Sequence, residues 1–431
     1  MWGWPMIILL LGTHLFLTIR LRFPQRHILR GIRLSFKRDK DAPGDVSQFG
    51  ALATSLAATI GTGNIIGVGT AVALGGPGAV FWCWLTGVLG IATKYGEGLL
   101  AVKYRVQTAD GRMLGGPMYA LQNGLGLRWM GILFCLFTCL ASFGIGNMVQ
   151  SNAISMLCHD SWGTSTAVSG LIIAAFAALV IIFGVKGIAR VCTVFVPFMA
   201  LFYVLGCLYI LFANASYVGP AISLILRSAF DPTAFGGGMV GITIITTLRA
   251  GCARGLFSNE SGLGSAPIVA AAAKTKNPVR QALVSSTGTF WDTVIICALT
   301  GIVLISTTLA YTDISYTDGG TLTRLAFSKI PVVGTPLLTF GIITFAFSTI
   351  LGWSYYGERA VEYLGGRKAG KPLSLAYRLI FIVLVFCGAV FQLDVVWNFS
   401  DVMNAMMALP NILALLLLSN VIYNETKKYK L

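Results

Sequence analysis

The sequence is poor in charge and in the side chains that most enzymes use for catalysis. Only 11% of its 431 residues are charged, whereas a soluble domain carries about 25%. With 56% hydrophobic residues as well, this deficit excludes an ordinary soluble protein and indicates an integral membrane protein. The three histidines, His14, His27 and His159, form no cluster. The apolar runs hold no Ser/His/Asp arrangement either, so we do not expect an enzyme.

Cysteine pairs with metal-binding or redox spacing are also missing. The nine cysteines include no CxxC pair, and most lie inside apolar runs. We interpret them as small apolar packing residues and expect no disulfide framework and no metal site built from them. Acidic residues are scarce, and the net charge is +15. The basic residues lie in short loops between apolar runs, so this charge does not indicate a nucleic-acid partner.

Glycine, in contrast, is abundant, and it interrupts an apolar run at residues 55–70. Gly61, Thr62, Gly63 and Asn64 stand at the centre of this run. Glycine allows the backbone to leave the helix, and an unwound segment at membrane depth is tolerated only where it is buried in protein or lines a cavity. We therefore predict a membrane helix that breaks here. The spacing alone leaves open the alternative of a close-packing face between continuous helices.

Such a break presents two helix ends of opposite polarity. A half-helix that ends near Ile60 directs carbonyl oxygens into the gap, which suits a cation. A half-helix that starts near Asn64 directs amide N–H groups into the gap, which suits a carboxylate. The stretch therefore predicts one site for a cation and a carboxylate together.

Eleven membrane spans are predicted from the apolar runs, each close to the ~20 residues that cross a bilayer, or longer. They cover residues 2–19, 48–75, 78–101, 129–157, 164–184, 189–213, 240–273, 281–309, 333–362, 375–392 and 397–422. Every second loop is basic, and the positive-inside rule assigns those loops to the cytoplasm. This topology places the N-terminus outside and the C-terminus in the cytoplasm. The segment 218–238 is too polar and broken to span, and we expect it to lie outside.

A second interruption lies in the span 240–273, five spans after the first. Residues 255–265 combine glycines and serines with Asn259 and Glu260. Two interrupted spans at matching positions in two halves of a chain are typical of inverted-repeat transporters, with the binding site between the repeats. The alternative is a plain loop between two short spans, which would put the later basic loops on the wrong side.

The chain is therefore expected to have three parts. Residues 1–46 form an N-terminal transmembrane helix and a basic cytoplasmic loop, residues 47–215 the first five-helix repeat, and residues 216–431 the second.

Polar residues deep in three other spans are further candidates for binding. The hydroxyls of Ser348 and Thr349 are hard oxygen ligands and suit a hard cation. Gln150 and Trp353 are placed to line a small pocket, and Asp292, as a carboxylate within a span, is a candidate functional residue. For the hydroxyls, Gln150 and Trp353, hydrogen bonding or packing between helices remains the alternative. For Asp292 the alternative is a salt bridge with a residue such as Arg254.

Several long motifs occur in the order in which one transporter family carries them. They cover residues 61–64, 75–82, 92–95, 254–260 and 352–358. On these motifs the sequence resembles the alanine or glycine:cation symporters, also called sodium/alanine symporters, from about Ser47 to about residue 420. The resemblance implies the all-α fold of the bacterial leucine transporter: a five-plus-five inverted repeat with two discontinuous helices, here with one extra N-terminal helix. Cys83 departs from the pattern, which leads us to expect Met.

The resemblance also implies a set of binding residues. For the substrate they are Thr62, Gly63, Asn64, Gln150, Phe257, Ser258, Thr349 and Trp353. For Na⁺ they are the backbone carbonyls of Ala57 and Ile60 and the hydroxyls of Ser348 and Thr349. A second Na⁺ site is implied less directly, at Thr59, Asn64 and Asp292.

Together, the residues and the resemblance predict a secondary active symporter that imports alanine or glycine by alternating access, with Na⁺ as the coupling ion. It is expected to work as a monomer in the cytoplasmic membrane. Its partners would be a small neutral amino acid, Na⁺ and the lipid bilayer. Two alternatives remain: a proton-coupled amino-acid transporter of the same fold with Asp292 as the proton carrier, and a transport-inactive amino-acid sensor.

Overall fold

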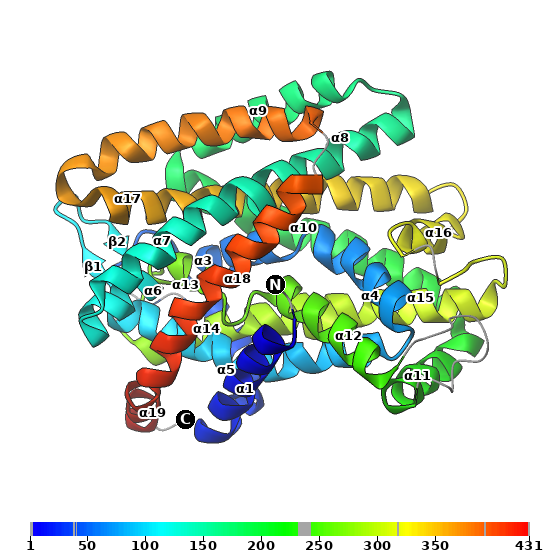
Figure 1. Ribbon diagram of the computed structural model, residues 1–431, viewed down its shortest axis with the longest axis horizontal. Helices are drawn as coiled ribbons and strands as arrows, with labels where there is room; N and C mark the ends of the chain where they lie inside the picture. The colour runs from blue at the N-terminus through cyan, green and yellow to red at the C-terminus, as the bar shows by residue number, and fades with distance from the viewer. Residues whose placement is uncertain are drawn as a thin grey trace.

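The computed structural model describes residues 3–37, 39, 41–231, 243–316, 319–391 and 394–429, with all their side chains except those of 367–369, 371 and 394–398. Helices make up most of the described chain, as the composition predicts. In Figure 1 the long helices, such as α5, α7, α10 and α17, run across the molecule in roughly similar directions.

The described residues of the first half form ten α-helices and one small hairpin. The helices are α1 (Trp4–Arg20), α2 (Ile28–Phe36), α3 (Gln48–Thr59), α4 (Val68–Gly75), α5 (Ala79–Lys103), α6 (Pro117–Tyr119), α7 (Arg128–Phe143), α8 (Val149–Trp162), α9 (Thr166–Ile181) and α10 (Gly184–Ala213). Short 3-10 or π-helical turns join some of them, namely η1 (Pro24–His27), η2 (Gly63–Gly67), η3 (Ala120–Gly124) and η4 (Gly144–Met148). After α5, the strands β1 (Val106–Gln107) and β2 (Met113–Leu114) pair antiparallel, with Val106 opposite Leu114.

The second half is helical wherever it forms regular structure within the described residues. Its elements are α11 (Ala215–Phe230), α12 (Ile244–Asn259), α13 (Ala266–Ala270), α14 (Pro278–Thr289), η6 (Phe290–Cys297), α15 (Ala298–Ala310), α16 (Leu322–Ser328), α17 (Gly334–Val390), α18 (Asp394–Leu417) and α19 (Ser419–Lys428). Gly366, with φ 59° and ψ −157°, interrupts α17. This element is therefore two helices joined at a kink.

The predicted spans coincide with helices or with broken helix pairs, but not all of them meet the criteria for a membrane span. Within the described residues, six helices are long and apolar enough to cross a membrane, or up to eight if each bent pair counts as one span. The bent pairs are α1 with residues 24–36, at 69°, and α3 with residues 63–75, at 54°. The multi-span helical architecture is therefore confirmed, whereas the count of 11 spans and the inverted repeat stay predictions.

The segment 218–238 is more regular than the sequence indicates. Its first part belongs to α11, which buries Ala221, Ile225 and Ala229 and leaves the opposite face exposed. Apolar residues four apart fall on one face of a helix, and this spacing explains the helix. The glycines at 236–238 lie outside the described residues.

The loop before α3 is tied to the segment that follows α13. Val46 pairs with Ala273 in a parallel bridge. Arg105, just past α5, donates to the carbonyl of Pro43 (3.1 Å) and to that of Thr275 (2.8 Å). These contacts hold together the ends of α3 and α13 that are predicted to face the cytoplasm.

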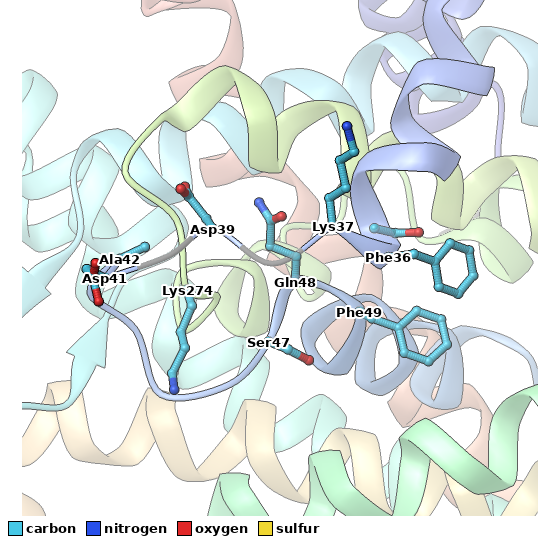
Figure 2. A pocket seen from close by; sticks show the side chains of 10 residues that line it. Phe36, Lys37, Asp39, Asp41, Ala42, Ser47, Gln48, Phe49 and Lys274 are labelled. Atoms are coloured by element: carbon cyan, nitrogen blue, oxygen red, sulfur yellow. The ribbon is translucent and has the colours of Figure 1, made fainter.

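A cavity of about 750 Å³ lies beside this loop. It is lined by Ser35, Phe36, Lys37, Asp39, Asp41, Ala42, Ser47, Gln48, Phe49 and Lys274. Figure 2 shows Phe36 and Phe49 side by side on one side of it and Lys274 on another, with the two rings stacked at a centroid distance of 5.1 Å. None of the predicted binding residues lines this cavity, so we do not assign the binding site to it.

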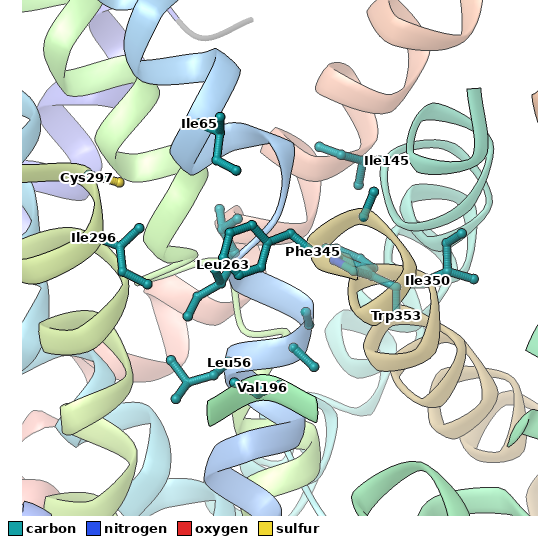
Figure 3. Close-up of a cluster of buried hydrophobic side chains, with 14 of the residues drawn as sticks. Leu56, Ile65, Ile145, Val196, Leu263, Ile296, Cys297, Phe345, Ile350 and Trp353 are labelled. Atoms are coloured by element: carbon teal, nitrogen blue, oxygen red, sulfur yellow. The ribbon is translucent and has the colours of Figure 1, made fainter. Parts of the chain in front are cut away.

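The apolar core surrounds the first interruption. α3 packs against α10, α14 and α17, and α5 packs against α12 and α14. Figure 3 shows Leu56 and Ile65, from either side of the interruption, in one buried cluster with Phe345 and Trp353 of α17 and Ile145 of η4. The interrupted segment is therefore enclosed by protein, which is the condition under which an unwound backbone is tolerated at membrane depth.

Candidate functional site

The first helix breaks where the sequence predicts. α3 ends at Thr59, and Ile60 has extended backbone angles (φ −77°, ψ 94°). Helical structure resumes with η2 at Gly63 and continues into α4, after a bend of 54°. The half-helix ends near Ile60 and Asn64 are therefore confirmed, and they face the same gap.

Hydrogen bonds of the Asn64 side chain stabilise the conformation of the break. Its side-chain oxygen accepts a hydrogen bond from the Gly61 amide (2.9 Å), and its amide nitrogen donates to Oδ1 of Asp292 (2.6 Å). The other oxygen of Asp292 accepts from Ser258 (3.0 Å) and from Thr293 (2.6 Å). Asp292 and Asn64 are fully buried. The carboxylate therefore joins the first break to α12 and to η6.

Three oxygen atoms converge at the carbonyl end of α3. The hydroxyls of Ser348 and Thr349 each lie 3.2 Å from the carbonyl oxygen of Ala57. Oxygens that share one hard cation at about 2.3–2.6 Å are spaced roughly this far apart. Both hydroxyls also lie near the Phe345 carbonyl, at 2.8 and 3.0 Å, so a hydrogen bond within α17 satisfies them when no ion is bound. The donor set fits a hard cation such as Na⁺.

Two of the predicted cation ligands are less directly placed. The Thr59 hydroxyl donates to the carbonyl of Ser55 (3.2 Å) and lies 3.4 Å from that of Leu56, both in its own helix. Its role beside Asn64 and Asp292 therefore stays a prediction. Ile60 follows the last helical residue, and its carbonyl as a ligand stays a prediction as well.

A small cavity lies against the break. Its volume is about 20 Å³, little more than the roughly 10–15 Å³ that one water requires. It is lined by Ala58, Thr59, Gly61, Thr62, Gly63, Ile145, Gln150, Phe257, Ser258, Glu260, Thr349, Trp353 and Asn404. The side chains therefore pack closely around this point and leave room for little more than one water.

The lining includes every predicted substrate residue except Asn64, which instead acts through its hydrogen bonds. Sequence reasoning did not assign Ala58, Ile145, Glu260 or Asn404 to the site. The sequence does point to Glu260, because a carboxylate within the interruption of a membrane span is a candidate binding residue. Asn404 had only its polarity within an apolar span, and its fully buried Oδ1 has no hydrogen-bond partner in the described part of the chain.

Close approaches fix the walls of the cavity. The Thr62 hydroxyl lies 3.4 Å from Oε1 of Gln150. A Cβ added at Gly146 would lie only 2.3 Å from the Cβ of Trp353, so glycine at this position allows η4 to approach α17. A Cβ at Gly63 would touch the Phe257 ring at 3.6 Å. The indole and the phenyl ring therefore bound the cavity on two sides.

The second interruption begins later than predicted. α12 continues through residues 255–259, and the break occupies residues 260–265, where Glu260, Gly262 and Gly264 have positive φ angles of 52°, 92° and 87°. The prediction was wrong for residues 255–259 because Gly255 serves helix packing. A Cβ there would lie 2.1 Å from the Thr86 hydroxyl of α5. The broken segment is buried, which argues against a plain surface loop.

A wider cavity of about 330 Å³ lies on the other side of Phe257. It is lined by Leu74, Thr246, Arg249, Ala250, Ala253, Arg254, Phe257 and Asp401. In the predicted topology these residues belong to the outer parts of their spans. Phe257 lines both cavities, so its ring separates the wider cavity from the break.

Charged side chains, buried or half-buried, form a cluster farther along α17. Glu358 accepts from Arg359 (2.6 Å) and from Arg378 (2.7 Å), and Glu362 accepts from Arg112 (2.7 Å) and from Arg359. These groups connect both parts of α17 with the β-hairpin. In the predicted topology this cluster lies on the cytoplasmic side.

Known proteins resemble this chain over its whole length. The model of the sodium:alanine symporter family matches residues 1–431. A protein of Haemophilus influenzae described as an uncharacterized transporter is 51% identical, over 99% of this chain and 93% of its own. The sodium/alanine symporter AgcS of Methanococcus maripaludis is 48% identical, over 99% of this chain and 94% of its own.

A solved structure shares the fold. The crystal structure of MhsT in complex with L-phenylalanine matches with a TM-score of 0.60 and 14% identity, covering 87% of this chain and 89% of that one. At that identity the likeness concerns the fold alone, which is of the leucine-transporter type.

Proposed function

The chain belongs to the sodium:alanine symporter family, and we propose that it imports alanine or glycine together with Na⁺ by alternating access. Members of this family are transporters and not enzymes. The observation that carries the proposal is the convergence of Ala57, Ser348 and Thr349 at the carbonyl end of α3, within the same break that begins a new helix at Gly63.

The two ends of the break give the two ligands different partners. Na⁺ would be held by the oxygens of Ala57, Ser348 and Thr349, with Ile60 completing the set. The carboxylate of the amino acid would accept hydrogen bonds from backbone amides at the start of η2, near Gly63, where the helix dipole favours negative charge.

The ammonium group of the amino acid requires acceptors. Glu260 is the acidic residue among those that line the cavity, and it follows the last residue of α12. We therefore assign the ammonium to the side of the cavity formed by the second break, near Glu260 and Ser258. A zwitterion would then lie between the two breaks.

The walls of the cavity favour a small side chain. Phe257 and Trp353 bound a cavity of about 20 Å³. Gly146 lets η4 lie so close to α17 that even an added Cβ would clash with Trp353, so the cavity can widen little on this side. One extra methylene that clashes in such a pocket costs about 1–3 kcal/mol. Alanine and glycine are therefore preferred to valine or leucine.

Alternating access requires one closed side at a time. The wider cavity beyond Phe257 supplies the outer approach, and the cluster around Glu358 and Arg359 supplies the inner closure. Each Na⁺ that enters down a potential of about 100 mV supplies roughly 2.3 kcal/mol. Because binding is reciprocal, Na⁺ must strengthen amino-acid binding as much as the amino acid strengthens Na⁺ binding.

The proposal includes the expected arrangement in the cell. The chain would act as a monomer in the cytoplasmic membrane, with its N-terminus outside, its C-terminus inside, and repeats at residues 47–215 and 216–431. A second Na⁺ near Asn64 and Asp292 is included as well. The oxygens of Asp292 that face Asn64, Ser258 and Thr293 provide the charge for it.

Uptake into proteoliposomes tests the proposal directly. An inward Na⁺ gradient should drive accumulation of labelled alanine, unlabelled glycine should compete, and leucine should not. Accumulation that follows a pH gradient and ignores Na⁺ would support the proton-coupled alternative with Asp292 as the carrier. Saturable binding of alanine without any accumulation would support the sensor.

A further inference from the structure

Helix α5 carries two charged residues that point into the protein interior. Lys94 and Glu97 are three residues apart, so they lie on one face of the helix. Each is only 2% exposed. Burial of a charged group carries a large free-energy cost unless partners compensate it. Both residues find partners in the second break, although Oε2 of Glu97 has no hydrogen-bond partner in the described part of the chain.

Lys94 binds the carbonyl end of α12. Its Nζ donates to the backbone carbonyls of Asn259 (3.0 Å) and Glu260 (3.3 Å). These are the last residue of the helix and its C-cap. A helix C-terminus carries partial negative charge and unsatisfied carbonyls, so the ammonium occupies the place where a free cation would otherwise be favoured.

Glu97 binds amide groups on the other side of the same break. Its Oε1 accepts from the amides of Gly262 (3.0 Å) and Gly264 (3.1 Å) and from the side chain of Asn411 (2.7 Å). Both glycines have positive φ angles, and backbone turns of this kind can direct neighbouring amides toward one anion. Side chains larger than hydrogen are strained in this conformation.

The second break therefore holds one cationic and one anionic group, the same pair that the first break is proposed to bind. We propose that Lys94 and Glu97 are tethered ligands of the second break, supplying from α5 the cation and the carboxylate that the first break takes from solution. The second break is then permanently occupied and does not depend on ions. It holds Phe257, Ser258 and Glu260 in position, while the first break responds to Na⁺ and the amino acid.

Lys94 and Glu97 are thus positioning residues for the transport site, and the inference rests on the proposed function. Hydrogen exchange, followed by mass spectrometry in lipid nanodiscs, separates the two. In the unmodified chain, replacing Na⁺ by N-methyl-D-glucamine should speed exchange at residues 57–67 and leave residues 259–265 unchanged. Equal Na⁺ dependence of both segments would overturn the tethered-ligand proposal, whereas no Na⁺ response at residues 57–67 would count against the proposed function instead.

Substitutions test the same point in transport. Lys94→Met should speed exchange at residues 259–265 at least about tenfold, because hydrogen bonds from a charged donor are lost, and should raise the KM for alanine. It should also make exchange at this segment Na⁺-dependent, since the carbonyl end of α12 is left open to a free cation. Lys103→Met is the matched control and should change neither measurement. Lys103 lies on the exposed side of the same helix and, among the described residues, forms its ion pair with Glu425 at the surface.

A double variant tests whether Lys94 and Glu97 do no more than neutralise each other. Lys94→Met with Glu97→Gln removes both charges of α5 that face the break, so neither is left buried without the other, and the variant remains testable even if the single variant fails to fold. If placement at the break is what matters, the double variant keeps the fast exchange and the raised KM. Recovery of normal exchange and uptake would mean that the two residues only neutralise each other, and the proposal would fall.

Discussion

The side-chain amide of Asn64 lies 2.6 Å from Oδ1 of Asp292, although the two residues are 228 positions apart. This contact joins the unwound backbone of the first broken helix to the helical segment η6. Because Asn64 also accepts from the Gly61 amide, one side chain couples the shape of the break to the environment of the carboxylate. A change at either residue should therefore affect both Na⁺ and amino-acid binding.

The charge of Asp292 can be tested separately from its shape. Asp292→Asn keeps the volume and removes the charge, and it should raise the Na⁺ concentration for half-maximal alanine uptake at least about tenfold if the carboxylate serves a cation. Asp313→Asn, in an exposed loop, is the control. Unchanged Na⁺ dependence in Asp292→Asn would leave the carboxylate a purely structural role.

Thr349 should be needed for its hydroxyl. Thr349→Val keeps the shape and removes one of the three oxygens that converge at the carbonyl end of α3, so Na⁺-driven uptake should be lost. Thr13→Val in α1 is a matched control, because Thr13 also donates to the carbonyl four residues earlier but lies outside the site. Normal uptake by Thr349→Val in proteoliposomes would refute the cation site as assigned.

Gly61 should not tolerate even a methyl group. In Gly61→Ala the added Cβ would lie 2.8 Å from the Thr349 hydroxyl, and it would displace an oxygen that is proposed to bind Na⁺. Uptake should fall to background. Gly12→Ala, whose Cβ meets nothing within 4 Å, should transport normally. The comparison is invalid unless both variants reach the membrane in equal amounts, as judged by immunoblot.

Trp353 should set the upper size of the substrate. Trp353→Ala removes one wall of the cavity and should allow valine and leucine to compete with alanine, since the penalty of about 1–3 kcal/mol per clashing methylene is relieved. Competition assays on labelled alanine uptake measure this change. If leucine and valine compete no better than before, the wall that excludes them lies elsewhere.

The inner charge cluster should contribute to stability. Glu358→Gln removes the carboxylate that Arg359 and Arg378 share. Loss of one partner of a fully buried pair costs about 3–5 kcal/mol, and this range is an upper bound here because Arg359 keeps Glu362. The thermal midpoint of the purified protein should fall clearly. Glu425→Gln, which breaks a surface pair, should shift it little, because such pairs contribute roughly 0–1 kcal/mol.

Much of the architecture follows from local properties of the sequence. The scarcity of charge and the long apolar runs determine a helical membrane protein, and the glycine-rich stretch 61–64 marks the region where the first helix is interrupted. These features depend on backbone freedom and hydropathy, which act over a few residues. The family is indicated by the order of several long motifs, which is also a property of the sequence alone.

The tertiary structure decided what the polar residues do. A glycine such as Gly255 within a span predicts an interrupted helix. In the structure it packs against Thr86, and the helix continues past it. Asn404 and Glu260 reach the cavity, and Lys94 reaches the carbonyl of Asn259, 165 positions away. Contacts between residues so far apart in the sequence depend on how the helices pack. The local sequence therefore does not determine which distant backbone group a buried charge contacts.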